Sequence, residues 1–79
     1  MVKLLSEFVP SEEGVVVKVN GEGRMRRRLL DMGITPDTKV VMRKTAPFGD
    51  PIEITLRGYE LTLRKAEAAF VECIAGEKR

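Results

Sequence analysis

The sequence predicts a small, mainly β fold, an antiparallel barrel of about five strands with one short helix after the first strand. Apolar and polar residues alternate along residues 52–56 and again along residues 59–63, which is typical of half-buried strands. Turns rich in Gly, Pro and Asp separate the apolar segments. So short a sheet would expose its edges, and closing it into a barrel hides them.

Length and composition indicate one folded unit. The chain has 79 residues, of which 43% are hydrophobic and 33% charged, so we expect a single domain over residues 1–79. The longest apolar run, residues 68–71, is far shorter than the roughly 20 residues of a membrane span, so we expect a protein that is not embedded in a membrane. Residues 1–7 lack the features of a secretory signal, which favours a cytoplasmic location.

The first third of the chain predicts one strand. Residues 4–10 form a short N-terminal segment whose apolar residues stand at helical spacing and which ends before a proline. The strand follows over residues 14–19. In this strand we expect one face to be shared by Val15, Val17 and Val19.

A short amphipathic helix is predicted over residues 22–32, with Asn20 as a possible cap. Its apolar stripe recurs at i, i+4 and i+7 and consists of Met25, Leu29 and Met32. Gly33 suits the left-handed position after a helix, and Ile34 can then pack back on Leu29 in a Schellman arrangement.

The remainder of the chain predicts four more strands. They cover residues 38–44, 52–56, 59–63 and 70–74. Between them we expect a turn at Pro36–Asp37, a loop over residues 46–51, a tight turn at Arg57–Gly58 and one helical turn over residues 65–69. The last four residues, 76–79, are expected to fray.

Charge is distributed unevenly along the chain. Residues 24–44 hold seven basic residues against two acidic ones, a net charge of +5, and because the whole chain carries +2 the remainder carries −3. The basic residues are Arg24, Arg26, Arg27, Arg28, Lys39, Arg43 and Lys44. The four arginines begin a helix, where the macrodipole disfavours cations. Either they form a solvated face, with Arg27 paired to Asp31, or they meet an acidic partner.

The sequence contains no recognisable catalytic grouping, and we expect that the protein is not an enzyme. It has no histidine to act as a base. Glu12 and Glu13 are expected in a solvated loop, and the single cysteine, Cys73, shares the core face of its strand with Val71 and is expected to be a buried, inert thiol. The methionines at 25, 32 and 42 are expected to fill the core. The metal ligands stay unknown: no cofactor is certain, and Fe(II), if bound, would be held weakly by oxygen ligands such as Asp50.

Several features together resemble one family. They are Gly14 with the valine strand, RRLLDMGITP (residues 27–36), PFGDP (47–51), GYELTLRKAEA (58–68) and the closing Val71-x-Cys73 pair. In order over nearly the whole chain, they are similar to the FeoA family of ferrous iron transport. The resemblance implies an SH3-like barrel and an accessory role in ferrous iron uptake, in which the protein binds and modulates the cytoplasmic part of the FeoB-type membrane transporter. One departure is Asp37, where the family usually has glycine, and Asp tolerates the left-handed conformation better than most residues.

Seven residues are predicted to bind the partner. They are Arg24, Arg26, Arg27 and Arg28 of the helix and Phe48, Gly49 and Asp50 of the 46–51 loop. Phe48 stands between two prolines and could anchor an interface, or it could fold back to plug the barrel end. We expect the protein at the inner face of the cell membrane through its partner, and no nucleic acid as ligand. The alternatives are a basic barrel that binds nucleic acid and a weak Fe(II)-binding regulatory domain, and the sequence leaves homo-oligomerisation open.

Overall fold

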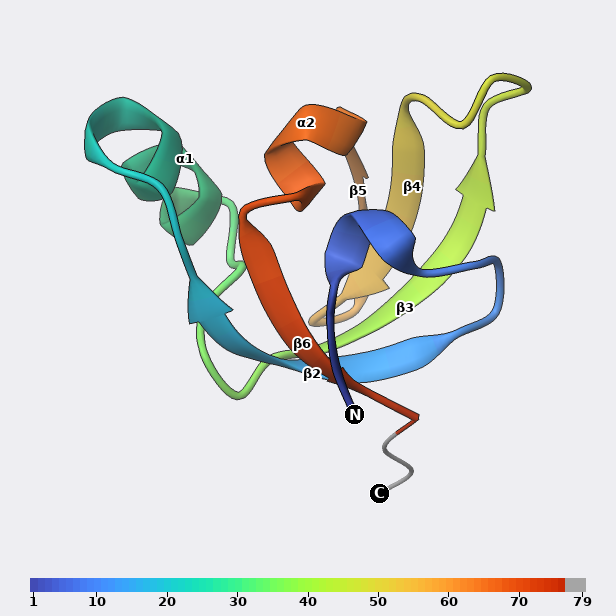
Figure 1. The fold of residues 1–79 in the computed structure, drawn as a ribbon, viewed down its shortest axis with the longest axis horizontal. Coiled ribbons are helices and arrows are strands. Elements are labelled where there is room, and N and C mark those ends of the chain that lie inside the picture. Colours follow the sequence, from blue (N-terminus) through green and yellow to red (C-terminus); the bar gives the residue numbers. More distant parts are fainter. Residues whose placement is uncertain (77–79) are drawn as a thin grey trace.

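A computed structural model describes residues 1–76, and within them six strands form one antiparallel sheet. The strands are β1 (Val2–Leu4), β2 (Glu13–Val19), β3 (Lys39–Thr45), β4 (Ile52–Leu56), β5 (Tyr59–Leu63) and β6 (Val71–Ala75). Their order across the sheet is β1-β6-β2-β3-β4-β5, and the sheet curves around a common core (Figure 1). The predicted mainly β barrel is confirmed. Because β1 and β5 end the sheet and are not neighbours, the barrel described by these residues stays open along one side.

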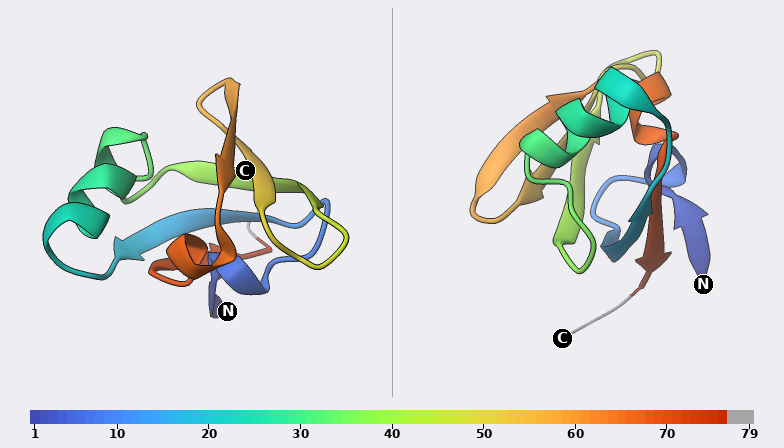
Figure 2. Two further views of the ribbon diagram at one scale, coloured as in Figure 1. Left: turned by 90° about the horizontal axis from the view of Figure 1, so that it is seen from above. Right: turned by 90° about the vertical axis from the view of Figure 1, so that its left-hand side faces the viewer.

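Short helices lie over one side of the sheet. They are the 3-10 helix η1 (Leu5–Glu7), α1 (Gly23–Asp31) and α2 (Lys65–Ala68). Figures 1 and 2 show α1, α2 and the loop over residues 46–51 on the same side of the molecule, at the top in Figure 1. None of the helices in residues 1–76 has the length and apolar character needed to cross a membrane.

The sixth strand, β1, was not predicted, and only its last residue, Leu4, belongs to the segment with helical spacing. Val2 pairs with Ile74 and Leu4 with Glu72, so the N-terminal segment extends the sheet beside β6. The helical spacing is partly correct, because η1 follows at once and buries Leu5. A strand of three residues shows too little alternation to be recognised in a sequence, and its pairing partner lies at the other end of the chain.

The prediction that Val15, Val17 and Val19 share one face of β2 is wrong. The register between β2 and β6 shifts between Val16 and Lys18, which marks a β-bulge. A bulge inserts one extra residue and reverses the alternation beyond it. Val16 and Val19 are therefore both buried in the core, whereas Val17 is exposed.

The end of α1 agrees with the prediction in detail. Gly33 has φ +96°, and its N–H donates to the Leu30 carbonyl at 3.0 Å. The Ile34 N–H donates to the Leu29 carbonyl at 3.1 Å, which completes the Schellman pattern. The start of the helix differs, because Asn20 does not cap it: its Nδ2 donates to Glu72 Oε2 at 2.7 Å and joins the helix entry to β6 instead.

The two predicted turns, at Pro36–Asp37 and at Arg57–Gly58, are present, and in each a residue other than glycine has a left-handed φ. Asp37 has φ 74° and Arg57 has φ 50°, followed by Gly58 at φ 84°, so residues 57–58 form the two-residue type I′ turn of the β4–β5 hairpin. The Arg57 side chain also ties this hairpin to the turn before β3, because its Nη2 donates to Thr35 Oγ1 at 2.8 Å and to Thr38 Oγ1 at 2.9 Å.

The core fills the concave side of the sheet. Its fully buried members come from every part of the chain and include Leu5, Val16, Leu29, Ile34, Met42, Ile54 and Cys73. Met25 of α1 and Met32, the residue that caps the end of this helix, pack half-buried against this core. The expectation that these methionines fill the core is confirmed.

Candidate functional site

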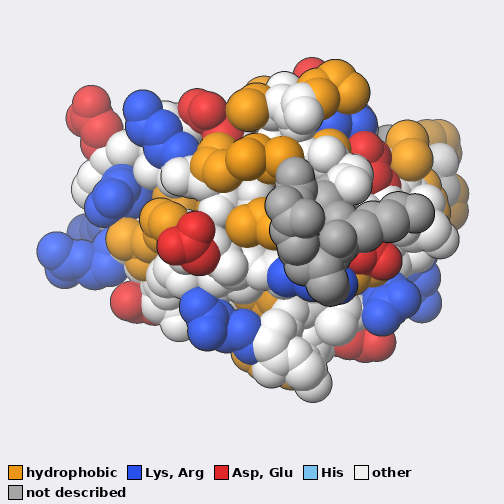
Figure 3. All heavy atoms as spheres, turned by 90° about the horizontal axis from the view of Figure 1, so that it is seen from below, with side chains coloured by type: hydrophobic (Ala, Val, Ile, Leu, Met, Phe, Trp, Pro, Cys, Tyr) orange, Lys and Arg blue, Asp and Glu red, His pale blue; other side chains and the backbone are white. Residues whose placement is uncertain are grey.

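The four arginines of α1 are exposed, as predicted for a binding surface or a solvated face. Figure 3 shows basic side chains projecting from the edge of the molecule where α1 lies. Two of the four are tied into the fold. Arg26 Nε donates to the Val19 carbonyl at 3.2 Å, and Arg28 forms an ion pair described below. Arg24 and Arg27 form no ion pair or side-chain hydrogen bond with any residue from 1 to 76.

The expected Arg27–Asp31 pair does not form among the described residues, and the ion pair of this helix is Arg28 with Glu67. Arg28 Nη1 lies 3.2 Å from Glu67 Oε2, and the Glu67 side chain is only 8% exposed. The other carboxylate oxygen of Glu67 accepts the Arg64 N–H at 2.9 Å. A buried carboxylate needs such partners, so this pair holds α1 against α2. The sequence offered no signal for it, because the two residues lie in different elements.

The loop over residues 46–51 presents Phe48 to solvent. The Phe48 side chain is 97% exposed, which excludes the alternative in which it plugs the barrel. The loop itself is held at its base: the Gly49 N–H donates to the Ala46 carbonyl at 2.7 Å, and the Ala46 N–H donates to the Pro51 carbonyl at 3.0 Å. Phe48 therefore stands on a supported turn.

Asp50 connects this loop to α2. Its Oδ1 accepts the Lys65 N–H at 2.9 Å. The carboxylate was predicted as part of a partner-binding loop and as an oxygen donor for Fe(II), and the structure gives it a further role in positioning the loop. No group of three His, Cys, Asp or Glu side chains in residues 1–76 could hold a metal ion.

A groove of about 340 Å³ brings two of the predicted segments together. It is lined by Arg28 of α1, Asp50 and Pro51 of the loop, Thr62 and Leu63 of β5, Arg64, and Glu67 of α2. Arg28 and Asp50 thus border one hollow although they are far apart in sequence. Thr62, Arg64 and Glu67 are additional residues of this surface that the sequence analysis missed.

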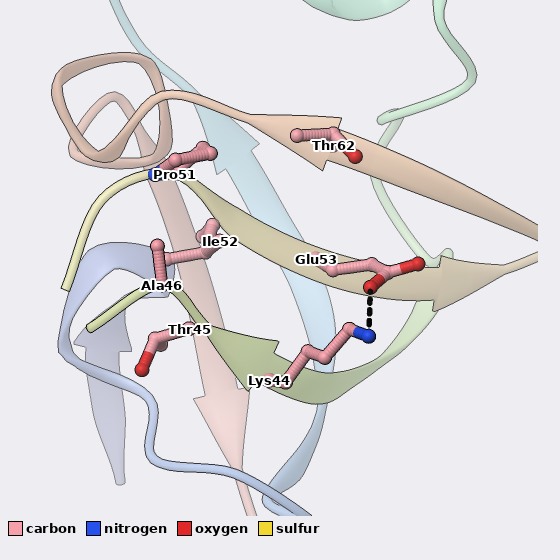
Figure 4. Close-up of a pocket in the computed structure, with 7 residues that line it drawn as sticks. All are labelled: Lys44, Thr45, Ala46, Pro51, Ile52, Glu53 and Thr62. Atoms are coloured by element: carbon pink, nitrogen blue, oxygen red, sulfur yellow. Dashed lines mark ion pairs between the residues drawn. The ribbon is translucent and has the colours of Figure 1, made fainter.

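Thr62 of β5 also lines a second hollow (Figure 4). It measures about 180 Å³, and its other lining residues belong to β3, β4 and the loop between them. Figure 4 shows the Lys44 side chain reaching Glu53 along one wall, where Nζ lies 3.6 Å from Oε1. With its cation already paired, this hollow offers no free charge to a ligand.

The expectation of a solvated loop at Glu12 and Glu13 is only partly correct, because Glu12 lies in the loop before β2 but is half-buried and paired, and Glu13 belongs to β2. Glu12 accepts the Val9 N–H at 2.9 Å and pairs with Lys3 at 3.0 Å, and these contacts, the Val9 hydrogen bond first, lower the pKa of its carboxyl group. Glu13 lies in β2 and pairs with Lys39 at 3.3 Å. Both carboxylates have structural partners.

Cys73 is fully buried, as predicted. Burial raises the pKa of its thiol to about 12, so the thiol stays protonated at neutral pH. A protonated, inaccessible thiol is neither a good nucleophile nor a good metal ligand.

Replacing Cys73 by valine is therefore expected to change the free energy of unfolding by less than about 1.5 kcal/mol, because the swap nearly conserves volume. Chemical denaturation measures this change. A loss larger than this would show that the thiol makes an interaction that the valine side chain cannot replace.

Comparison with known proteins identifies the family. The sequence profile of the FeoA domain matches residues 3–74. The chain belongs to the FeoA family. It is also 34% identical over 68 residues, 86% of the chain, to a fusion protein of Porphyromonas gingivalis described as Fe(2+) transport protein A/Fe(2+) transporter FeoB. The chain matches 8% of the length of that fusion protein.

Solved FeoA structures share this fold. The FeoA-like protein from Clostridium acetobutylicum superposes with a TM-score of 0.89 at 35% identity, over 99% of this chain and 91% of that one. Stenotrophomonas maltophilia FeoA complexed with zinc, described as a prokaryotic SH3 domain protein, gives a TM-score of 0.78 at 27% identity, over 90% and 88% of the two chains. The predicted SH3-like barrel and the resemblance to FeoA are both confirmed. FeoA is an accessory family of iron transport and not a family of known enzymes.

Proposed function

We propose that this FeoA chain binds the cytoplasmic part of an FeoB-type ferrous iron transporter and modulates its activity. The observation that carries the proposal is the fusion protein in which a relative of this chain and the FeoB transporter are one polypeptide. Covalent linkage keeps two modules at a high effective concentration, which favours modules that act on one another. In this role it would act in the cytoplasm, at the inner face of the membrane.

Two surface features support a docking role. The exposed arginines belong to α1 and the exposed Phe48 to the 46–51 loop, two elements on the same side of the molecule, and residues of both, Arg28 and Asp50, border one groove. A basic surface accelerates association with an acidic partner, and an aromatic anchor slows dissociation. This combination suits a partner that carries an acidic surface next to an apolar pocket.

The direct test is binding of the purified chain to the purified cytoplasmic domain of the FeoB-type transporter from the same organism. Surface plasmon resonance at physiological salt, with and without guanine nucleotide and Fe(II), gives the affinity and both rate constants. The same chain is tested on mixed-sequence DNA and RNA. Saturable binding to the transporter domain supports the proposal. Tight nucleic-acid binding with no binding to the domain would refute it and favour the basic-barrel alternative.

Reversing two charges on α1 is expected to slow this association. Arg24→Glu with Arg27→Glu should lower the association rate constant about fivefold at low salt and reduce its salt dependence, because exposed interface charges act mainly on encounter. These two arginines are chosen because Arg26 and Arg28 contact Val19 and Glu67, so changing them would also disturb the fold.

The matched control moves the same charge change to the sheet, with Lys18→Glu and Arg43→Glu, both exposed and outside α1. Because Arg43 Nε donates to Thr55 Oγ1 at 2.8 Å, the melting temperature of the control is measured alongside its binding. The control is expected to lower the association rate constant by less than half the factor seen for Arg24→Glu with Arg27→Glu. Equal slowing by the two double variants would mean that net charge, and not the surface of α1, steers the partner.

A further inference from the structure

The outer edge of β5 carries backbone groups that the sheet leaves unpaired. The two-residue turn at residues 57–58 makes Leu56 and Tyr59 a hydrogen-bonded pair, and hydrogen-bonded and non-hydrogen-bonded pairs then alternate along an antiparallel ladder. Glu60, opposite Thr55, and Thr62, opposite Glu53, fall in non-hydrogen-bonded pairs. Their N–H and C=O groups therefore point away from β4, at the end of the sheet.

No described part of the chain covers this edge. Strand β5 ends the sheet, and among residues 1–76 no hydrogen bond reaches the backbone of Glu60 or Thr62. Both residues are exposed. Proteins usually protect an open edge with proline, a bulge or a covering element, because unpaired backbone groups pair readily with another chain. Strand β5 contains no proline, and its pairing with β4 is regular from end to end.

The groove that borders this edge is lined by two arginines and two carboxylates, so its charges balance. Thr62, Leu63 and Arg64 form one wall, and Arg28 of α1 forms the other. The two carboxylates in the groove already have partners, since Asp50 accepts the Lys65 N–H and Glu67 binds Arg28 and the Arg64 N–H. The Arg64 side chain forms no ion pair with residues 1–76. Arg24 and Arg28 together line a further hollow, on the surface of α1. Arg28 is paired with Glu67, and the two arginines without a partner carboxylate among residues 1–76 that an incoming chain would meet are therefore Arg64 and Arg24.

We propose that the β5 edge binds an extended acidic segment of a partner protein, which adds to the sheet as a further strand. The backbone groups of Glu60 and Thr62 would supply the hydrogen bonds of this β-augmentation, and the arginines would supply its charge preference. Side chains of a strand alternate between two faces. The acidic residues therefore occupy alternate positions, on the side of the groove that Arg64 lines. The opposite face is disfavoured because the neighbouring Glu53 carboxylate raises the pKa of Glu60 there, so negative charge is already crowded on that face. The inference rests on the proposed function only for the identity of the partner.

Proline at position 62 tests the edge directly. The Thr62 N–H points outward, so Thr62→Pro removes no hydrogen bond of the β4–β5 ladder, whereas it blocks a strand from pairing. We expect T62P to weaken binding of the transporter's cytoplasmic domain at least tenfold and T62V, which keeps the N–H, to weaken it less than threefold. If T62P does not fold, as judged by its circular dichroism melt, Glu60→Pro provides the same test at the second outward N–H.

Amide hydrogen exchange gives an independent measurement on the unmodified protein. In the free protein the Glu60 and Thr62 amides should exchange within seconds, whereas the Leu61 and Leu63 amides, which face β4, should be protected. In the complex with the transporter domain, the Glu60 and Thr62 amides should slow at least tenfold. Binding without this slowing, and with equal affinity for T62P, would overturn the edge inference and leave the proposed function standing.

A peptide experiment covers the case in which the transporter domain does not bind, which would overturn the proposed function alone. The probe is a blocked heptapeptide of alternating glutamate and valine, at millimolar concentration, with its lysine–valine counterpart as control. Chemical-shift changes centred on the Glu60 and Thr62 amides with the glutamate peptide only would support the edge inference. No chemical-shift change, or equal changes with both peptides, would overturn it. Dimerisation of the free protein that T62P abolishes would also overturn it, because a second copy of this chain would then occupy the edge.

Discussion

Gly33→Ala is expected to lower the free energy of unfolding by about 2 to 3 kcal/mol. Gly33 has φ +96°, where a side chain is strained by about 1 to 2 kcal/mol. A Cβ there would also lie 2.7 Å from Tyr59 Oη, and that hydroxyl donates a hydrogen bond to the Met32 carbonyl. The alanine methyl must displace the hydroxyl, which adds roughly 1 kcal/mol for the lost hydrogen bond.

Gly58→Ala is the matched control. Gly58 also has a left-handed φ, 84°, but a Cβ there would meet no atom within 4 Å. Its cost is therefore backbone strain alone, about 1 to 2 kcal/mol, without the additional loss at Tyr59. Thermal and urea denaturation of both variants measure the difference. In a Tyr59→Phe background the extra cost of G33A should nearly vanish. Equal destabilisation by G33A and G58A would show that contact with Tyr59 does not matter.

Phe48→Ala is expected to raise the dissociation rate from the transporter's cytoplasmic domain about five- to thirtyfold, a loss of about 1 to 2 kcal/mol of binding free energy. The phenyl ring is 97% exposed and is presented by a hydrogen-bonded loop, so little order is lost when a partner buries it. The effect should be nearly independent of salt, unlike that of the α1 arginines. Stopped-flow or surface plasmon resonance kinetics at two salt concentrations measure it.

The same variant should leave the melting temperature unchanged, because Phe48 buries almost nothing in the free protein. Val9→Ala serves as the control, since Val9 is also exposed but belongs to the segment between η1 and β2. V9A should alter neither stability nor binding. Unchanged dissociation of F48A would exclude Phe48 as the anchor, and a lowered melting temperature would mean that the ring packs against the barrel in solution.

Local patterns predicted those parts of the fold whose causes are local. The β4–β5 hairpin follows from strict alternation on both sides of Arg57–Gly58, and its bounds agree with the structure. The end of α1 follows from one glycine after an apolar stripe. Cys73 was placed in the core by its period-2 spacing from Val71, and both are buried. Each of these features depends on residues within a few positions of one another, so the sequence displays the cause directly.

The candidate site was predictable in its parts but not in its arrangement. The charge cluster of α1 and the aromatic residue in the 46–51 loop are visible in the sequence. Whether Phe48 points into the barrel or away from it depends on how the loop is held, and Asp50 holds it through the Lys65 N–H. No pattern linked Arg28 to Glu67, or the loop to the edge of β5.

By itself the sequence determined the family, the mainly β class, the central hairpin, the helix after the first predicted strand and the absence of histidine chemistry. Tertiary structure alone decided that β1 joins β6, that a bulge turns Val17 outward, and that α1, α2 and the loop meet at one groove beside an open strand edge. The physical reason is the sequence separation between the residues that interact. Hydrophobic periodicity and turn chemistry act between near neighbours, whereas strand order, buried ion pairs and free edges depend on contacts between residues that the chain brings together only when the whole core closes.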